Sequence, residues 1–399
     1  MGFITRFFQR PIFSDKRFVF SIWILVALFA GLKHAFNGVN NNYLIFKYVF
    51  YNTLDQVNLY AGYADKYFDV NHYGPIFSLV IAPFALLPDS IGTILWEVCI
   101  AITLLIAIYK LPIIWKGKVI IYWIALHELY VNATNSNTNT LIAALIIGTF
   151  ICIKSQKEFW AACFITLGLF IKLYGVVGLA FFFFSKNKIK LIGYLFLWSF
   201  IFFVLPMLIS SPQFVVQSYI DWYNELIVKN DSNTISLMQN ISVIGMIRKI
   251  GGLYEISTLV IILPAMFLFA LQYIQVRAYS NPVYQFGILA STLMFVVLFS
   301  SGSETCTYII AITGAVLWFL IQKKPYSKYV MSLFIITIII TICAGSDIAP
   351  AFIRSDIIRP YALKALPYFI VWLTLIYQLV TFRKSETSVL SNGYITDNK

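Results

Sequence analysis

Residues 16–43 read KRFVFSIWILVALFAGLKHAFNGVNNNY, and this stretch decides the class of fold. Two basic residues precede an apolar run from Phe18 to Phe36, and three consecutive asparagines follow at Asn40–Asn42. An apolar helix of about 20 residues matches the thickness of a bilayer and satisfies its own backbone groups. We therefore predict that Phe18–Phe36 is a membrane helix, with its basic start in the cytosol and Asn37 outside.

The rest of the chain repeats this alternation of basic residues, apolar run and polar segment. The sequence is 60% hydrophobic and only 12% charged, with a mean hydropathy of +0.81, whereas soluble domains are about half apolar and about a quarter charged. We predict an all-α polytopic membrane bundle of roughly ten to twelve spans. The further apolar runs are 75–87, 90–109, 119–130, 141–153, 160–184 (broken at Lys172 and Gly175), 191–209, 257–276, 283–299, 308–321, 329–343 and 361–382.

The segment 75–109 does not fit a simple alternation. It follows a segment that we place outside, it is interrupted at Pro88 and Asp89, and it ends at the basic cluster Lys110–Lys118. Two complete crossings would leave that cluster outside, against the tendency of basic loops to stay in the cytosol. Two alternatives remain: one of the two runs does not cross completely, or the cluster is an exception to the charge rule.

The net charge of +12 is compatible with nucleic-acid binding, but its distribution indicates a membrane. Lys and Arg cluster between the spans, as is typical of cytosolic loops that face anionic lipid headgroups. We expect membrane lipids and no nucleic acid as partners, and a multi-pass protein of the inner cell membrane with both termini in the cytosol. The clusters lie at Arg6–Arg17, Lys110–Lys118, Lys154–Lys157, Lys186–Lys190, Lys323–Lys328 and Arg383–Lys384.

We predict one membrane domain over 1–399. Its first outer loop is 37–73, whose aromatic residues suit short helices in the membrane interface. A second large outer loop is 210–256, and 383–399 is a cytosolic tail. The five cysteines are scattered and the three histidines lack the spacing of a metal site, so we expect no metal and no cofactor.

Polar side chains that can carry chemistry gather in the predicted outer segments or interrupt the spans. Charged groups at such places need a partner or a watery pocket. A carboxylate or an imidazole can take the proton of a hydroxyl group, and the candidate catalytic residues are Asp55, Asp69, His72 and Glu304. Amides, aromatic rings and cations suit sugars and phosphates, and the candidate binding residues are Asn41, Asn42, Tyr73, Asn135, Asn137, Asn139, Lys172, Asn240 and Arg248.

Each of these candidates has a plainer alternative. Asp55 and Asp69 are also explained as solvated loop carboxylates, and His72 as an interfacial side chain. The asparagines are equally suited to cap helix ends, and Arg248 to contact a lipid headgroup instead of a substrate phosphate.

Several stretches, in their order along the chain, carry a resemblance to a known family. They are YNTLDQVNLYAGYADKYFDVNHYGPIFSLVIAPFALLP (51–88), NATNSNTNTLIAALI (132–146), LGLFIKLYG (167–175), QNISVIGMIRK (239–249), SETCTYIIAITGAVLWF (303–319) and YALKALPYFIVW (361–372). Together they resemble glycosyltransferase family 87, whose members are GT-C-type mannosyltransferases that depend on polyprenyl-phosphate mannose. Where the family places an acidic residue just after the first span, this chain has Asn40–Asn42, and an amide cannot take a proton.

The resemblance implies a GT-C-type membrane enzyme that moves a hexose, mannose-like, from a polyprenyl-phosphate sugar to a lipid or glycan acceptor. It implies an inverting hexosyltransferase that works at the extracytoplasmic face of the membrane. Two alternatives stay open: an envelope polysaccharide polymerase or ligase, and a solute transporter. A transporter predicts internal repeats with matching broken helices, and we find no such repeat in the sequence.

Overall fold

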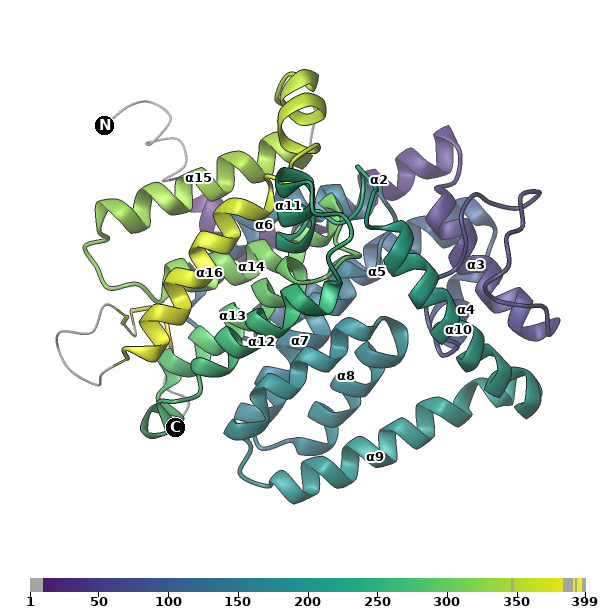
Figure 1. Cartoon of the computed structure of the whole chain (residues 1–399), viewed down its shortest axis with the longest axis horizontal. Helices are drawn as coiled ribbons and strands as arrows, with labels where there is room; N and C mark the ends of the chain where they lie inside the picture. Colours follow the sequence, from purple (N-terminus) through teal and green to yellow (C-terminus); the bar gives the residue numbers. More distant parts are fainter. Residues whose placement is uncertain (1–9, 346–347, 383–389, 392, 397–399) are drawn as a thin grey trace.

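The computed structural model describes residues 10–345, 348–382, 390–391 and 393–396. Within these residues the chain is helical, and extended residues pair only in two isolated bridges (Figure 1). The predicted all-α membrane bundle is confirmed. Arg6 and the pair Arg383–Lys384, which we predicted to be cytosolic, lie outside the described residues.

In the part of the chain that the structure describes, four helices are long and apolar enough to cross a membrane: α2 (Lys16–Asn37), α5 (Asp89–Lys110), α9 (Lys188–Val204) with its continuation η3 (Leu205–Leu208), and α15 (Lys328–Gly345). Shorter apolar helices complete the bundle, and they are α7 (Asn139–Lys154), α8 (Glu158–Ile171), η2 (Leu173–Phe184), α12 (Thr258–Leu271), α13 (Pro282–Leu298), α14 (Tyr308–Leu320) and α16 (Ala365–Val380). The less apolar α6 (Trp115–Thr134) packs against α2 and α14. Each predicted apolar run from 119 onward therefore contains a helix.

The segment 75–109 forms two helices of unequal length, which decides between the two alternatives for this segment. α4 (Phe77–Ala85) has only nine residues, too few to cross a bilayer. It packs against α3 (Asn41–Leu54), where Tyr43 Oη donates to the carbonyl of Phe84 at 3.0 Å. Of these two helices α5 is the one long and apolar enough to cross, so the first run is the one that does not.

The predicted break within 160–184 is confirmed. α8 ends at Ile171, Lys172 is extended, and η2 returns alongside α8. The two arms are in close contact at Gly168 and Gly175. A Cβ built on Gly175 would lie only 2.2 Å from the carbonyl carbon of Gly168, so there is no room for a side chain. A side chain at this position would push the arms apart and move Lys172.

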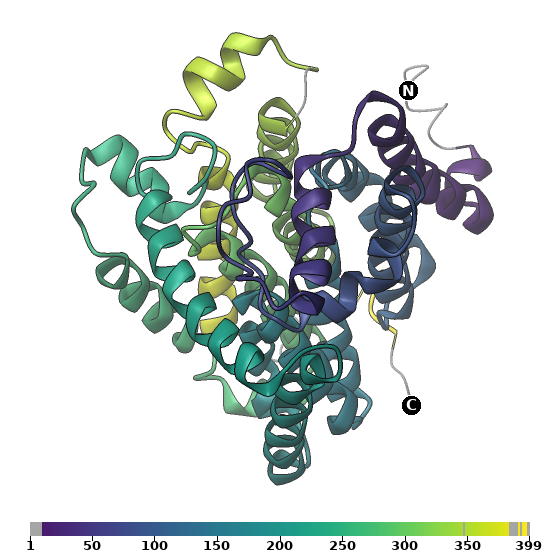
Figure 2. The ribbon, with the colours of Figure 1, turned by 90° about the vertical axis from the view of Figure 1, so that its right-hand side faces the viewer.

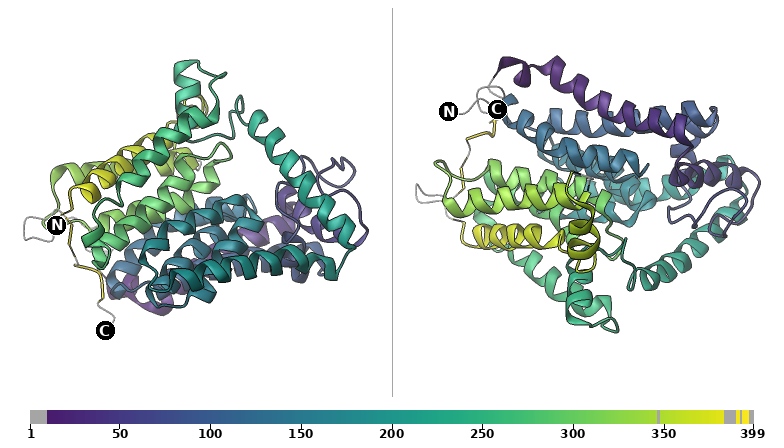
Figure 3. Two further views of the ribbon diagram at one scale, coloured as in Figure 1. Left: turned by 60° about the horizontal axis from the view of Figure 1, so that its bottom comes forward. Right: turned by 90° about the horizontal axis from the view of Figure 1, so that it is seen from above.

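One end of the bundle, here called the basic end, holds the start of α2 and the turn between α5 and α6. Trp115 Nε1 donates to the carbonyl of Ser14 at 2.7 Å, and the amide of Ile114 donates to the carbonyl of Tyr394 at 2.8 Å. The described part of the predicted tail is thus packed against the bundle. The other end, here called the polar end, holds α3, α10 (Pro212–Ser232) and α11 (Val243–Gly251), and α10 runs across it in Figure 3.

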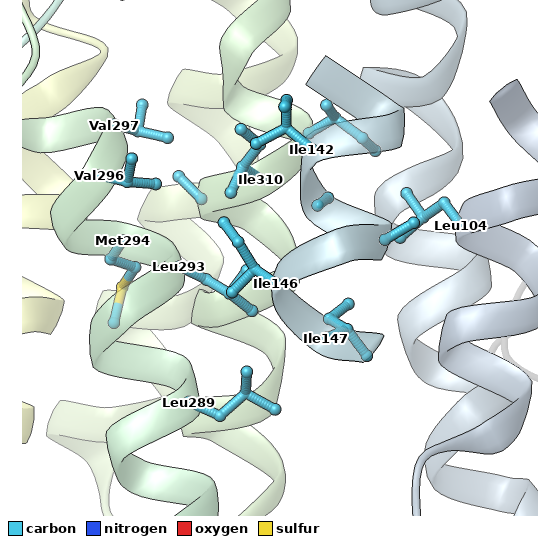
Figure 4. Packing of buried hydrophobic residues seen from close by; sticks show 14 of the residues in the cluster. Leu104, Ile142, Ile146, Ile147, Leu289, Leu293, Met294, Val296, Val297 and Ile310 are labelled. Atoms are coloured by element: carbon cyan, nitrogen blue, oxygen red, sulfur yellow. The ribbon is translucent and has the colours of Figure 1, made fainter. Parts of the chain in front are cut away.

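Between the two ends the interior is apolar. α7, α13 and α14 meet there, and Ile146, Leu293 and Ile310 from these helices are fully buried (Figure 4). Helices that carry such side chains all round belong in the middle of a bundle. The polar groups that interrupt the chain are consequently displaced toward the polar end.

Candidate functional site

A cavity of about 300 Å³ opens at the polar end. Its walls come from α3, the loop before α4, the break between α8 and η2, α10, and the segment between α13 and α14. The lining residues are Asn42, Ile45, Phe46, Asp69, Val70, His72, Tyr73, Asn137, Lys172, Leu173, Tyr174, Leu226, Lys229, Asn230, Asn233, Gln239, Ser300, Ser301, Gly302 and Glu304. Segments more than 200 residues apart in the sequence therefore line the same cavity.

The cavity gathers many of the predicted site residues. They are Asn42, Asp69, His72, Tyr73, Asn137, Lys172 and Glu304. These include three of the four candidate bases and the lysine that interrupts a predicted span. Their roles remain predictions, but their positions in one cavity are a finding.

Other predicted site residues lie outside this cavity. Asp55 is exposed at the end of α3. Asn41 exchanges two hydrogen bonds of 2.7 Å with the backbone of Phe68, and Asn135 donates to the carbonyl of Val131. Asn240 accepts a hydrogen bond from Ser242.

Arg248 also lies outside the cavity. Its side chain is buried, and its Nη2 donates to the carbonyl of Ile256 at 2.7 Å and to Thr258 Oγ1 at 3.0 Å. Its Nη1 donates to Thr234 Oγ1 at 3.3 Å. These bonds hold the turn between α11 and α12, and this geometry matches a structural role more closely than phosphate binding.

Glu304 is fixed at the start of η5 (Thr305–Thr307). Its backbone amide donates to Thr307 Oγ1 at 3.0 Å, while its carboxylate accepts from the backbone of Thr307, which is the reciprocal arrangement of a capping box. Gln239 Nε2 donates to Oε1 at 3.3 Å. Cys306 Sγ donates to Oε2 at 3.4 Å. Within the described residues no cation forms an ion pair with this carboxylate, which lines the cavity.

Lys172 faces the same cavity from the break between α8 and η2. Its Nζ donates to Asn139 Oδ1 at 3.1 Å and lies 4.6 Å from the ring centroid of Tyr174. Among the residues that the structure covers, no carboxylate forms an ion pair with it. A lysine in a bundle interior needs a counter-charge or water, which makes an anionic ligand a fitting partner.

A cluster of charged side chains from the loop before α4 and from α10 contributes Asp69, His72 and Lys229 to the cavity wall. His72 Nδ1 lies 3.0 Å from Glu225 Oε1, His72 Nε2 lies 3.7 Å from Asp69 Oδ1, and Lys229 Nζ lies 3.4 Å from Asp69 Oδ2. Burial opposes protonation of His72, but the two carboxylates outweigh burial and raise the pKa of the imidazole. His72 and Lys229 in turn hold the pKa of Asp69 well below its usual range. His72 thus favours its cationic form here.

The loop that carries these groups is fixed against the bundle and α10, as Figure 2 shows for 55–76. Trp222 Nε1 donates to the carbonyl of His72 at 3.0 Å, and the amide of Gly74 donates to the carbonyl of Ile171 at 3.2 Å. A Cβ on Gly74 would lie 2.1 Å from the carbonyl oxygen of Phe170. Only glycine allows this approach, which brings His72 and Lys172 to one cavity.

Several residues in the cavity wall or directly behind it were not predicted from the sequence, and Glu225, which contacts His72, is one of those behind it. Glu225 and Lys229 lie one turn apart on α10, on the side that also carries Trp222 and Leu226 toward the loop. The helical spacing of these residues within 210–256 was a usable signal, because i and i+4 positions share a face. Tyr174, Gln239 and the serines 300 and 301 gave no comparable pattern.

Comparison with known proteins gives a family but no individual relative. The description "Glycosyltransferase family 87" matches residues 71–301, which is more than half of the chain. No curated protein matches the sequence. The matched region begins at Asn71 and ends at Ser301. His72, the second matched residue, and Ser301, the last, line the cavity. The chain belongs to glycosyltransferase family 87.

Proposed function

We propose that this glycosyltransferase is an inverting, GT-C-type hexosyltransferase. It takes a hexose, mannose-like, from a polyprenyl-phosphate donor and transfers it to a lipid or glycan acceptor at the extracytoplasmic face. The observation that carries the proposal is one cavity at the polar end of a membrane bundle that holds both Lys172 and Glu304. A donor with an isoprenoid tail is already dissolved in the bilayer, which explains why its enzyme would be a membrane bundle.

The two ends of the bundle support the proposed orientation. The described basic residues Lys16, Lys118 and Lys324 lie at the end opposite the cavity, close to Ser14 and Tyr394. Basic loops favour the cytosolic side. This supports cytosolic termini in the inner membrane and a cavity that opens to the outside.

Lys172 is the proposed partner of the donor phosphate. Lys172 has no carboxylate partner among the described side chains, and the donor phosphate supplies this negative charge. The phosphate gains further negative charge as the sugar leaves. A cation placed where charge develops lowers the barrier of the reaction. Lys229, which lines the same cavity, is a second cation for the phosphate, although Lys229 also forms an ion pair with Asp69.

Glu304 is the proposed general base. The acceptor oxygen attacks the anomeric carbon, the bond from that carbon to the phosphate oxygen breaks, and the phosphate leaves with the bonding electrons. Glu304 takes the proton of the acceptor hydroxyl, and a single displacement inverts the anomeric centre. Asp69 is the weaker candidate, because its ion partners lower its pKa and hence its basicity.

Aromatic and amide groups in the cavity suit the sugar. Tyr73 and Tyr174 contribute aromatic side chains to the cavity wall, and Asn42 and Asn137 contribute amide groups for hydroxyl recognition. Membership of the family supports sugar transfer over solute transport. A polymerase or ligase would use a diphosphate carrier, so the number of phosphates on the accepted donor separates that alternative from ours.

Glu304→Gln tests the assignment. The purified chain is placed in proteoliposomes that contain envelope lipids, with polyprenyl-phosphate mannose labelled in the sugar, and the loss of label from the donor is measured. We expect kcat to fall by about 10²- to 10⁴-fold, which is the range for loss of a general base, with donor affinity nearly unchanged. Asp55→Asn, at the exposed end of α3, is the matched control and should remain active. Full activity of Glu304→Gln would remove Glu304 as the base.

A further inference from the structure

A second charged pair lies behind the wall of the cavity. Lys364, directly before α16, and Glu128 on α6 are 2.9 Å apart from Nζ to Oε2, and their side chains are 1% and 0% exposed. Neither residue lines the cavity. The pair therefore does not touch a substrate placed there.

Lys364 makes one further bond that leads to the site. Its Nζ donates to the backbone carbonyl of Thr305 at 3.1 Å, and Thr305 directly follows Glu304. The same Nζ lies 4.7 Å from the ring centroid of Tyr308, at the start of α14. The cation thus contacts the short η5 segment between the cavity and α14 from behind.

The surroundings leave the pair no freedom to move. His127 Nδ1 lies 3.0 Å from Glu128 Oε1 on the side away from Lys364. A Cβ on Gly345, at the end of α15, would lie 2.9 Å from His127 Cε1 and 3.2 Å from Glu128 Oε1. Gly345 of α15 and His127 of α6 thus lie against the Glu128 carboxylate, while the ammonium group of Lys364 contacts Glu128, the Thr305 carbonyl and the Tyr308 ring.

We propose that Lys364 and Glu128 are positioning residues for Glu304. The ion pair fixes the ammonium group, the ammonium group fixes the Thr305 carbonyl, and η5 then holds the Glu304 carboxylate toward the acceptor hydroxyl. This inference rests on the proposed role of Glu304 as the base.

Stability alone does not account for the pair. Removing two charges from water costs free energy that their attraction only partly returns, and an apolar pair of similar volume often serves a fold as well or better. An apolar pair cannot hold the Thr305 carbonyl, however. The feature that distinguishes this pair from hydrophobic packing is its hydrogen bond to the residue next to Glu304.

The test replaces both charges together, as Glu128→Leu with Lys364→Met, so that no lone charge stays buried. We expect a folded, monodisperse protein whose affinity for labelled polyprenyl-phosphate mannose stays within about threefold of the unmodified chain. We expect kcat to fall by about 100-fold, since a displacement of about 1 Å in a reacting group has this effect. Hydrogen exchange of the amides in 303–309 should become faster.

The matched control is Gln322→Leu with Gln378→Leu. Gln378 Nε2 donates to Gln322 Oε1 at 2.9 Å, and both residues are buried at the basic end, far from Glu304. This double substitution also removes a buried polar pair, which joins the segment just after the end of α14 to α16, but it leaves η5 untouched. It should preserve kcat and the exchange rates of 303–309.

Each other outcome overturns the inference. Unchanged kcat in the Glu128/Lys364 double variant would show that Glu304 needs no tether, and a large loss of donor affinity would show that the whole cavity depends on the pair. Failure of the double variant to fold would make the pair a requirement of the bundle. If Glu304→Gln is itself fully active, the proposed base fails instead, and that result is independent of the double variant.

Discussion

Lys172 and Asn139 form the hydrogen bond that joins the broken hairpin to the segment of Glu304. Lys172 Nζ donates to Asn139 Oδ1 at 3.1 Å, and Asn139 Nδ2 faces Thr307 Oγ1 at 3.5 Å on the other side. Thr307 caps the backbone of Glu304. The proposed phosphate partner and the proposed base are therefore linked through one asparagine at the start of α7.

Replacing Lys172 with methionine should weaken donor binding and leave the hairpin folded. A hydrogen bond to a charged group contributes about 1.5–3 kcal/mol, so we expect the Kd for polyprenyl-phosphate mannose to rise about 10- to 100-fold. Binding of the labelled donor to the protein in proteoliposomes gives this value. Lys157→Met, an exposed lysine at the far end of α8, is the control. An equal effect of both substitutions would mean that only overall charge matters.

The alternation of apolar runs with basic and polar segments predicted the membrane bundle, including the break at Lys172, because each span must carry a long apolar run whatever it packs against. It did not show which of the two apolar runs in 75–109 crosses the membrane. That decision depends on where α4 packs, and Tyr43 and Tyr51 on α3 hold it by its carbonyls at Phe84 and Ala85. Such contacts between segments are not visible in local composition.

The candidate site was predicted in part for the same reason. Asp69, His72, Lys172 and Glu304 are costly residues beside apolar runs, and that cost marks them in the sequence. Glu225 belongs to an ordinary amphipathic helix and became notable only once α10 lay against His72. Arg248 looked like a phosphate ligand in the sequence, but its guanidinium group is bonded to the turn at Ile256.

Replacing Arg248 with alanine should lower stability, whereas replacing Lys229 with alanine should lower the affinity for the donor. Arg248→Ala leaves the carbonyl of Ile256 without its donor, which should lower the free energy of unfolding by about 1–3 kcal/mol. Lys229→Ala removes a cation from the cavity wall and should raise the donor Kd with little change in stability. Thermal unfolding and donor binding are measured for both variants. A rise in donor Kd for Arg248→Ala alone would restore the interpretation of Arg248 as the phosphate ligand.

The attachment of the outer loop to α10 should weaken as the pH rises. The folded state raises the pKa of His72 above its ordinary value of 6.5, so the stability gained from its protonation is complete below pH 6.5. It is lost as the pH rises through the raised pKa. The pKa of Asp69 is lowered instead from 3.8, and its contribution is lost only as the pH falls below that value.

The pH range that tests this therefore begins at about pH 5, below the ordinary pKa of imidazole, and extends upward through the raised pKa of His72. Hydrogen exchange of residues 69–74, corrected for the intrinsic effect of pH, should show falling protection across that range. In His72→Gln the side chain cannot take a proton, so protection should be the same at both ends of the range. A slope that persists in His72→Gln would assign the pH dependence to another group, and a flat profile in the unmodified chain would show that the contact with Glu225 does not need the cationic imidazole.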